Sequence, residues 1–104
     1  MEMFYLQYGC IPSQTSDVYG EYGGAYISCW IKAASIVAAR TMAELAIQEN
    51  KWIVQELEES YPIKQEDYEK DDVSLEYYQQ AEIDGEVYVY DAWPNEPQEE
   101  DQVH

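Results

Sequence analysis

The residues of this sequence that could act as acids, bases or nucleophiles are few, apart from its carboxylates. The only histidine is His104, the last residue, and the only cysteines are Cys10 and Cys29. Without an internal histidine, neither a serine–histidine–aspartate triad nor a cysteine–histidine pair can be assembled. A general base of the usual kind is therefore missing. We expect a protein that is not an enzyme and that uses no cofactor.

The carboxylates are abundant but do not form a recognisable catalytic or metal-binding motif. A glycosidase needs two carboxylates at a fixed separation, one of them with a raised pKa in an apolar cleft, and no such pair stands out between Glu56 and Asp72. An EF-hand loop that begins at Asp67 would place Asp72 where glycine is required. We expect no dedicated metal site, and a small carboxylate-rich metal-binding domain remains an alternative.

The cysteines and the glycine-rich segment each allow a structural and a functional interpretation. Cys10 and Cys29 could form a disulfide or redox pair, but a chain without a secretion signal favours two small buried side chains on neighbouring strands. Two thiols without further cysteine or histidine ligands do not make a zinc site. Residues 20–24 lack the spacing and the lysine of a phosphate-binding loop, so we expect them to connect strands.

The net charge is strongly negative and unevenly distributed. Five Lys and Arg against 22 Asp and Glu give −17. Residues 1–55 hold three basic and five acidic side chains (−2), whereas residues 56–104 hold two basic and 17 acidic ones (−15). Such a surface repels nucleic-acid phosphates and anionic lipids, so we expect neither nucleic acid nor a membrane as partner. A start without a basic signal region and the absence of a long apolar run predict a cytoplasmic protein.

Tyrosines alternate with acids in the second half of the chain. Tyrosine offers a large contact area at a low entropy cost, and closely spaced carboxylates can imitate a phosphate backbone. The alternative is a solvated acidic face that only improves solubility. We predict a partner-binding surface in which tyrosines supply aromatic contacts and acids supply charge, formed by Glu58, Glu59, Asp67, Tyr68, Asp71, Asp72, Glu76 and Tyr77.

Hydrophobic patterning predicts the strands that position these residues. Stretches rich in aromatic and β-branched residues, some of them alternating, predict strands over residues 3–11, 25–32, 52–59 and 86–91. Both sides of the second strand are apolar, which predicts a central position in the sheet. Tyr61-Pro62 is expected to break the third strand.

Two segments have the composition of helices. Residues 33–50 are rich in alanine, and Ser35 and Asn50 could cap the two ends. Residues 65–84 are more polar, with a narrow apolar stripe and Gly85 as a stop.

The order β-β-α-β-α-β predicts an α+β fold. We expect a two-layer sandwich, in which a four-stranded, mostly antiparallel sheet carries two helices on one face. A single domain is predicted over residues 1–94, followed by a disordered acidic tail over residues 95–104, which has no apolar periodicity.

Several short segments also support a family resemblance. These are Gly24–Trp30, Glu49–Trp52, Glu66–Tyr68, Ser74–Tyr77 and the stretch from Asp84-Gly85 to Trp93-Pro94. On these residues the chain, over positions 24–97, resembles a group of small uncharacterised acidic bacterial proteins. The resemblance implies no activity, so no functional residue carries over.

Taken together, these features favour a binding role. We predict a small acidic non-enzymatic protein that binds a basic surface of a partner protein, of the inhibitor, DNA-mimic, anti-defence or immunity type. The alternatives are the metal-binding domain and a housekeeping domain of unknown role. The housekeeping domain could form a homodimer through an exposed strand edge.

Overall fold

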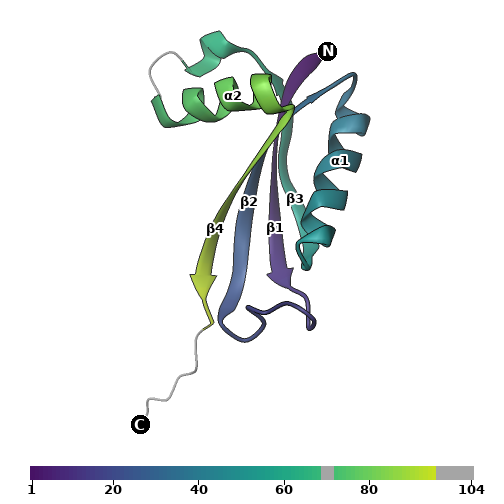
Figure 1. Ribbon diagram of the computed structural model, residues 1–104, viewed down its shortest axis with the longest axis vertical. Helices are drawn as coiled ribbons and strands as arrows, with labels where there is room; N and C mark the ends of the chain where they lie inside the picture. The colour runs from purple at the N-terminus through teal and green to yellow at the C-terminus, as the bar shows by residue number, and fades with distance from the viewer. Residues whose placement is uncertain (69–71, 96–104) are drawn as a thin grey trace.

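The protein is built on one four-stranded antiparallel sheet. The computed structural model describes residues 1–68 and 72–95, without the side chain of Asp72. The strand order is β3-β1-β2-β4 (Figure 1). The predicted sheet and the order β-β-α-β-α-β are confirmed. The strands are β1 (Glu2–Pro12), β2 (Tyr22–Ala33), β3 (Trp52–Ile63) and β4 (Glu86–Pro94).

The strand order separates the two halves of the sequence. The central strands β1 and β2 come from the nearly neutral first half, whereas most of edge strand β3 and all of edge strand β4 come from the acidic second half. Most of the predicted tail lies outside the described residues, which end at Asn95. Within these limits, neither helix is long and apolar enough to cross a membrane.

Helix α1 (Ile36–Glu49) has the two caps that the sequence predicts, although it is shorter than the predicted range 33–50 because β2 extends to Ala33. The Ser35 hydroxyl accepts a hydrogen bond from the Ala38 amide at 3.1 Å, and Asn50 caps the other end. The helix connects β2 to β3, which run in the same direction on either side of β1. Its buried residues Ala39, Ala43 and Ile47 contact the sheet. Because two of these side chains are small, the helix can approach the strands closely.

The core under α1 contains most of the buried side chains. Strands β1 and β2 contribute alternate residues, and Trp52 of β3 closes one end. Its largest fully buried side chains are Tyr8, Leu6, Ile27, Ile31, Ile47 and Cys29. The Tyr8 hydroxyl donates to a Glu44 carboxylate oxygen at 2.9 Å, which satisfies the one polar group of that buried ring.

The second helical segment is shorter and interrupted. The 3₁₀ turn η1 (Gln65–Tyr68) precedes α2 (Asp72–Asp84), which stops at Gly85 as predicted. Gly85 has a φ of +89°, a left-handed conformation that glycine adopts without strain, and its amide donates to the Ala81 carbonyl at 2.7 Å.

The two helices lie on opposite faces of the sheet, which corrects the prediction that they share one face. Tyr78 and Ala81 of α2 pack with Met3, Trp30 and Ile63, whose side chains point away from α1. Figure 1 shows α2 across one end of the strands and α1 along the other side. The physical reason is that both faces of β1 and β2 are apolar, so each face needs its own cover.

Strand β3 continues through Pro62 to Ile63, so the expected break at Tyr61-Pro62 is wrong. Pro62 pairs with Phe4 of β1. Proline is tolerated here because β3 is an edge strand, with one side that does not pair within the sheet. The extension matters because it brings Tyr61 alongside Tyr5.

Cys10 and Cys29 are free, buried and on neighbouring strands, as the sequence favours. Cys29 lies opposite Leu6 and Cys10 lies opposite Ala25, so the two thiols are not cross-strand partners. Burial raises the pKa of the Cys10 thiol to about 11 and that of Cys29 further. Both remain protonated at neutral pH, where a thiol is a poor nucleophile.

Candidate functional site

Helix α2 covers only part of its face of the sheet. Beyond it, towards the end of β1, several large side chains remain exposed: Ile11 is 38% exposed, Tyr26 43%, Ile53 44% and Trp93 41%. We call this area the open face. Its side chains share the α2 side of the strands: Gln7, Gly9, Ile11, Tyr26, Ile53, Glu56, Glu58, Glu59, Asp91 and Trp93.

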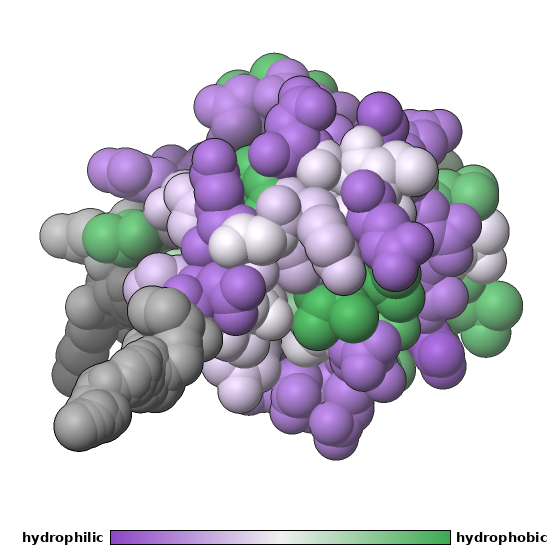
Figure 2. Space-filling view, turned by 90° about the horizontal axis from the view of Figure 1, so that it is seen from below, coloured by the Kyte–Doolittle hydropathy of each residue, from purple (hydrophilic) through white to green (hydrophobic). Residues whose placement is uncertain are grey.

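The open face runs to the end of the molecule where β1 and β4 terminate. Figure 2 shows this end: a small apolar patch and residues of intermediate hydropathy lie near its centre, with hydrophilic side chains around them. A shallow depression there is lined by Ile11, Tyr19 and Tyr22, among others. The Asn95 amide donates to the Glu21 carbonyl at 2.9 Å and so fixes the last described residue beside the loop.

The exposed charges of the open face all have one sign. Glu56, Glu58, Glu59 and Asp91 are exposed, and none of the residues that form this face is basic. Irregular pairing between β1 and β3 lets Glu58 and Glu59 point to the same side although they are neighbours in sequence. Glu58 lies over Gly9: its Oε2 atom is 3.1 Å from where a Cβ would be.

An aromatic ring of the open face covers the neighbouring Gly24 of β2. The Trp93 indole lies directly over Gly24, so closely that a Cβ on this glycine would overlap the Trp93 ring. Tyr26 packs beside it, with ring centroids 5.2 Å apart. The two rings therefore pack against each other, and their outer surfaces contact solvent.

Between the open face and α2 lies a hollow of about 470 Å³. We call it the aromatic hollow, since six aromatic residues line it. They are Tyr5, Trp30, Tyr61, Tyr68, Tyr77 and Tyr90, of which Tyr90 belongs to the side of β4 that packs under α1. The polar lining residues include Ser28, Glu59, Ser74 and Asp91.

Direct contacts hold the rings of the aromatic hollow in place. Trp30 is 4% exposed and touches both Tyr5 (centroids 5.1 Å apart) and Tyr77 (5.0 Å). The Trp30 indole nitrogen donates to the Tyr68 hydroxyl at 3.2 Å. Tyr61 lies beside Tyr5 at 5.5 Å. The rings are therefore ordered before any ligand arrives.

Two hydroxyls at the aromatic hollow have polar partners within it. The Tyr5 hydroxyl shares a 3.1 Å hydrogen bond with Ser28, and the Tyr61 hydroxyl donates to the Glu59 carboxylate at 3.3 Å. Partial burial, together with the negative charge of Glu59, raises the pKa of Tyr61 to about 12. Burial also raises the pKa of Tyr5. Both rings therefore stay neutral at pH 7.

Three of the eight predicted site residues meet at the aromatic hollow: Glu59, Tyr68 and Tyr77. Glu58 lies next to it on β3, within the open face. These four residues come from three different elements, β3, η1 and α2. The predicted combination of aromatic and acidic side chains is therefore present at this place.

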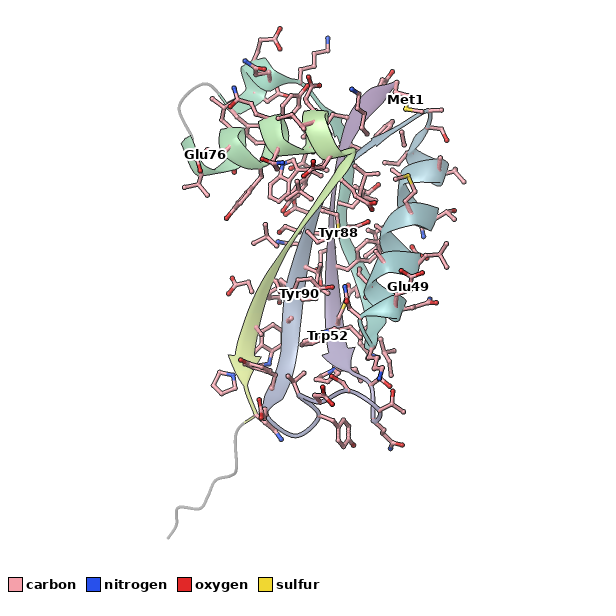
Figure 3. All side chains as sticks on the ribbon, in the orientation of Figure 1. Met1, Glu49, Trp52, Glu76, Tyr88 and Tyr90 are labelled. Atoms are coloured by element: carbon pink, nitrogen blue, oxygen red, sulfur yellow. The ribbon has the colours of Figure 1, made fainter. Side chains whose placement is uncertain are left out.

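The other predicted residues lie elsewhere. Asp67 accepts a hydrogen bond from the Lys64 amide at 2.9 Å, which closes the 3₁₀ turn. Glu76 is exposed on α2 at the end of the helix far from the strands (Figure 3). Asp71 lies outside the described residues, and Asp72 is the first residue of α2, with no described side chain.

The sequence-based prediction did not include Tyr5, Trp30, Tyr61 and Asp91. A signal for two of them exists: Tyr5 and Trp30 both fall on the sides of their strands that point away from α1, and they pair directly across β1 and β2. Asp91 depends on β4 pairing with β2, which sequence patterns do not specify.

The side of the sheet under α1 offers a contrasting set of polar contacts. The Tyr88 hydroxyl donates to Glu86 at 2.6 Å, and Asn50 donates to the Tyr90 hydroxyl at 3.2 Å. Figure 3 labels Trp52, Tyr88 and Tyr90 along the strands on this side of the molecule. The Tyr88 and Tyr90 hydroxyls on this face therefore both have hydrogen-bond partners within the protein.

Neither a cluster of metal ligands nor an ion pair involves the open-face carboxylates in the described part of the chain. No group of three or more His, Cys, Asp or Glu side chains converges as metal ligands among the residues that the structure describes. One ion pair is present in those same ranges, Arg40 with Glu44 on α1 at 3.5 Å. The carboxylates of the open face therefore have no described cationic partner.

Comparison of the chain with protein-family models, with curated proteins and with solved structures finds no match in any of the three. The resemblance to small acidic bacterial proteins therefore stays a prediction.

Proposed function

We propose that this protein is a non-enzymatic binding protein that docks onto a basic surface of a partner protein. Its role would be that of an inhibitor, a DNA mimic, an anti-defence protein or an immunity protein in the cytoplasm. One observation carries the proposal: the open face combines four exposed carboxylates and no basic residue with exposed Ile11, Tyr26, Ile53 and Trp93.

This combination has the anatomy of an interface. Clusters of exposed large apolar side chains bordered by polar groups are typical of protein-binding sites. Aromatic residues frequently supply most of the binding energy in such sites. The carboxylates would steer a cationic partner to this face and fix its orientation.

The same charges argue against two copies pairing through the open face. Such a dimer would place Glu56, Glu58, Glu59 and Asp91 opposite a surface of the same sign, which costs free energy. We therefore propose a different, basic protein as the partner.

The test compares two variants of equal net charge. In the first, the open-face variant, Glu56→Gln, Glu58→Gln, Glu59→Gln and Asp91→Asn are combined. In the second, the matched control, Glu2→Gln, Asp17→Asn, Glu49→Gln and Glu82→Gln neutralise four exposed acids elsewhere. A partner captured from host lysate is purified, and its Kd for each protein is measured by calorimetry at low and high salt.

We expect the open-face variant to bind the partner about tenfold more weakly or worse, and to lose most of the salt dependence. The affinity of the control for the partner should fall by about threefold at most, because distant exposed charges are screened by salt. Equal losses in the two variants would contradict the proposal, and so would a captured partner that is not basic.

A further inference from the structure

The aromatic hollow has the composition of a site for an organic cation. Faces of electron-rich rings attract cations, most strongly where the rings are partly shielded from water. Here Tyr5, Tyr61, Tyr68 and Tyr77 surround the well-buried Trp30 at the base of the hollow. Their mutual contacts fix the rings in advance, so a bound cation would not have to order them.

Carboxylates stand on both rims of this hollow. Glu59 belongs to β3 and Asp91 to β4, the two edges of the sheet. Since neighbouring strands are about 4.8 Å apart, the two rims are about 14 Å from one another across the sheet. The hollow is thus wide enough for a side chain to enter between them. Within the described ranges, neither carboxylate forms an ion pair.

We propose that the aromatic hollow receives an arginine side chain of the basic partner, an inference that rests on the proposed function. A guanidinium is planar, so it can stack on a tyrosine ring while its edge donates hydrogen bonds to Glu59 or Asp91. It is also more weakly hydrated than an ammonium group. A lysine ammonium can also lie over a ring face, but it has no planar group that could stack on the ring.

The test uses two peptides of equal charge, hexa-arginine amide and hexa-lysine amide, titrated into the full-length protein at low salt. Binding is measured by calorimetry. Charge attraction alone gives the two peptides similar affinities, whereas the aromatic hollow predicts tighter binding of the arginine peptide by about three- to tenfold.

Tyr61→Leu then removes one aromatic ring and keeps a shorter apolar side chain. Tyr61 is 44% exposed, so the fold should tolerate the change. We expect the preference for arginine to fall by about threefold. The matched control is Tyr19→Leu, which alters a 55% exposed tyrosine outside the hollow and should leave the preference unchanged. Glu59→Gln provides a second variant, expected to weaken the arginine peptide more than the lysine peptide.

The outcomes separate this inference from the proposed function. If both peptides bind equally, or if Tyr61→Leu and Glu59→Gln leave the preference for arginine unchanged, the arginine site is overturned while binding to basic surfaces stands. If neither peptide binds at low salt, the proposed function itself is contradicted. A preference that Tyr19→Leu reduces as much as Tyr61→Leu also overturns the site.

Discussion

The two faces of the sheet are built from the same strands but are closed to different degrees. Under α1, Ala39, Ala43 and Ile47 lie against the strands and the core is complete. Under α2, Tyr78 and Ala81 are the buried residues among the described side chains of the helix, and the open face is left to solvent.

The two faces differ because the two helices cover them to different extents. A helix with a wide stripe of small residues can cover a sheet from end to end, whereas a helix with a narrow stripe covers only the strands it crosses. The uncovered part is where aromatic and acidic side chains of β3 and β4 collect. The central strands thus supply most of the core, and the edge strands supply the carboxylates of the proposed binding surface.

The largest expected effect contrasts the buried core with the open face. Leu6→Ala removes a fully buried side chain under α1 and should lower the free energy of unfolding by about 3 kcal/mol. Tyr26→Ala on the open face should cost about 1 kcal/mol, since that ring is 43% exposed. Urea unfolding followed by tryptophan fluorescence measures both. Equal losses would show that the open face contributes to stability as much as the core does.

A smaller effect distinguishes two glycines of β1 and β2. A Cβ at Gly24 would overlap the Trp93 ring and lie 2.9 Å from the Cys10 carbonyl oxygen, so Gly24→Ala should cost about 1–3 kcal/mol. Gly9→Ala is the control: its Cβ would meet the flexible end of Glu58 at 3.1 Å, which can move away. Thermal unfolding compares the two. A Gly9→Ala loss as large as that of Gly24→Ala would contradict the described packing of Trp93.

The smallest effect is expected at alkaline pH. Burial raises the pKa of Tyr8 and Tyr88 under α1 and that of Tyr61, to about 12, at the aromatic hollow. The unfolded chain releases these protons near pH 10, where the folded protein still holds them. Stability should therefore be fully present below pH 10 and decline as the pH rises towards 12. Absorbance of tyrosinate, recorded with circular dichroism, should show Tyr8 and Tyr88 ionising only as the fold is lost.

Much of the fold follows from local patterns. The alternation of apolar and polar residues predicts strands close to their observed positions. Ser35 and Asn50 cap α1 as expected, and α2 ends before Gly85. The placement of α2 could not be obtained in the same way. Both faces of β2 are apolar. This pattern indicates that both faces are covered, but it does not indicate which helix covers which face.

The site was predictable to a smaller extent. The acidic and aromatic composition indicated Glu59, Tyr68 and Tyr77, which do meet at the hollow. Their other partners come from strands distant in sequence: Tyr5 and Trp30 face each other through the β1–β2 register, and Asp91 arrives through β4. Register and strand order depend on tertiary pairing, which a single sequence does not reveal.

The central claim is that the open face and the aromatic hollow, rather than acidic surface in general, bind cationic protein. Chemical-shift mapping of backbone amides in the full-length protein, titrated with hexa-arginine amide, tests it most directly. We predict shifts concentrated at Gln7, Tyr26, Glu59, Tyr61 and Asp91, with the amides of α1 unchanged. Shifts that are strongest on α1, or spread evenly over every acidic segment, would contradict the claim.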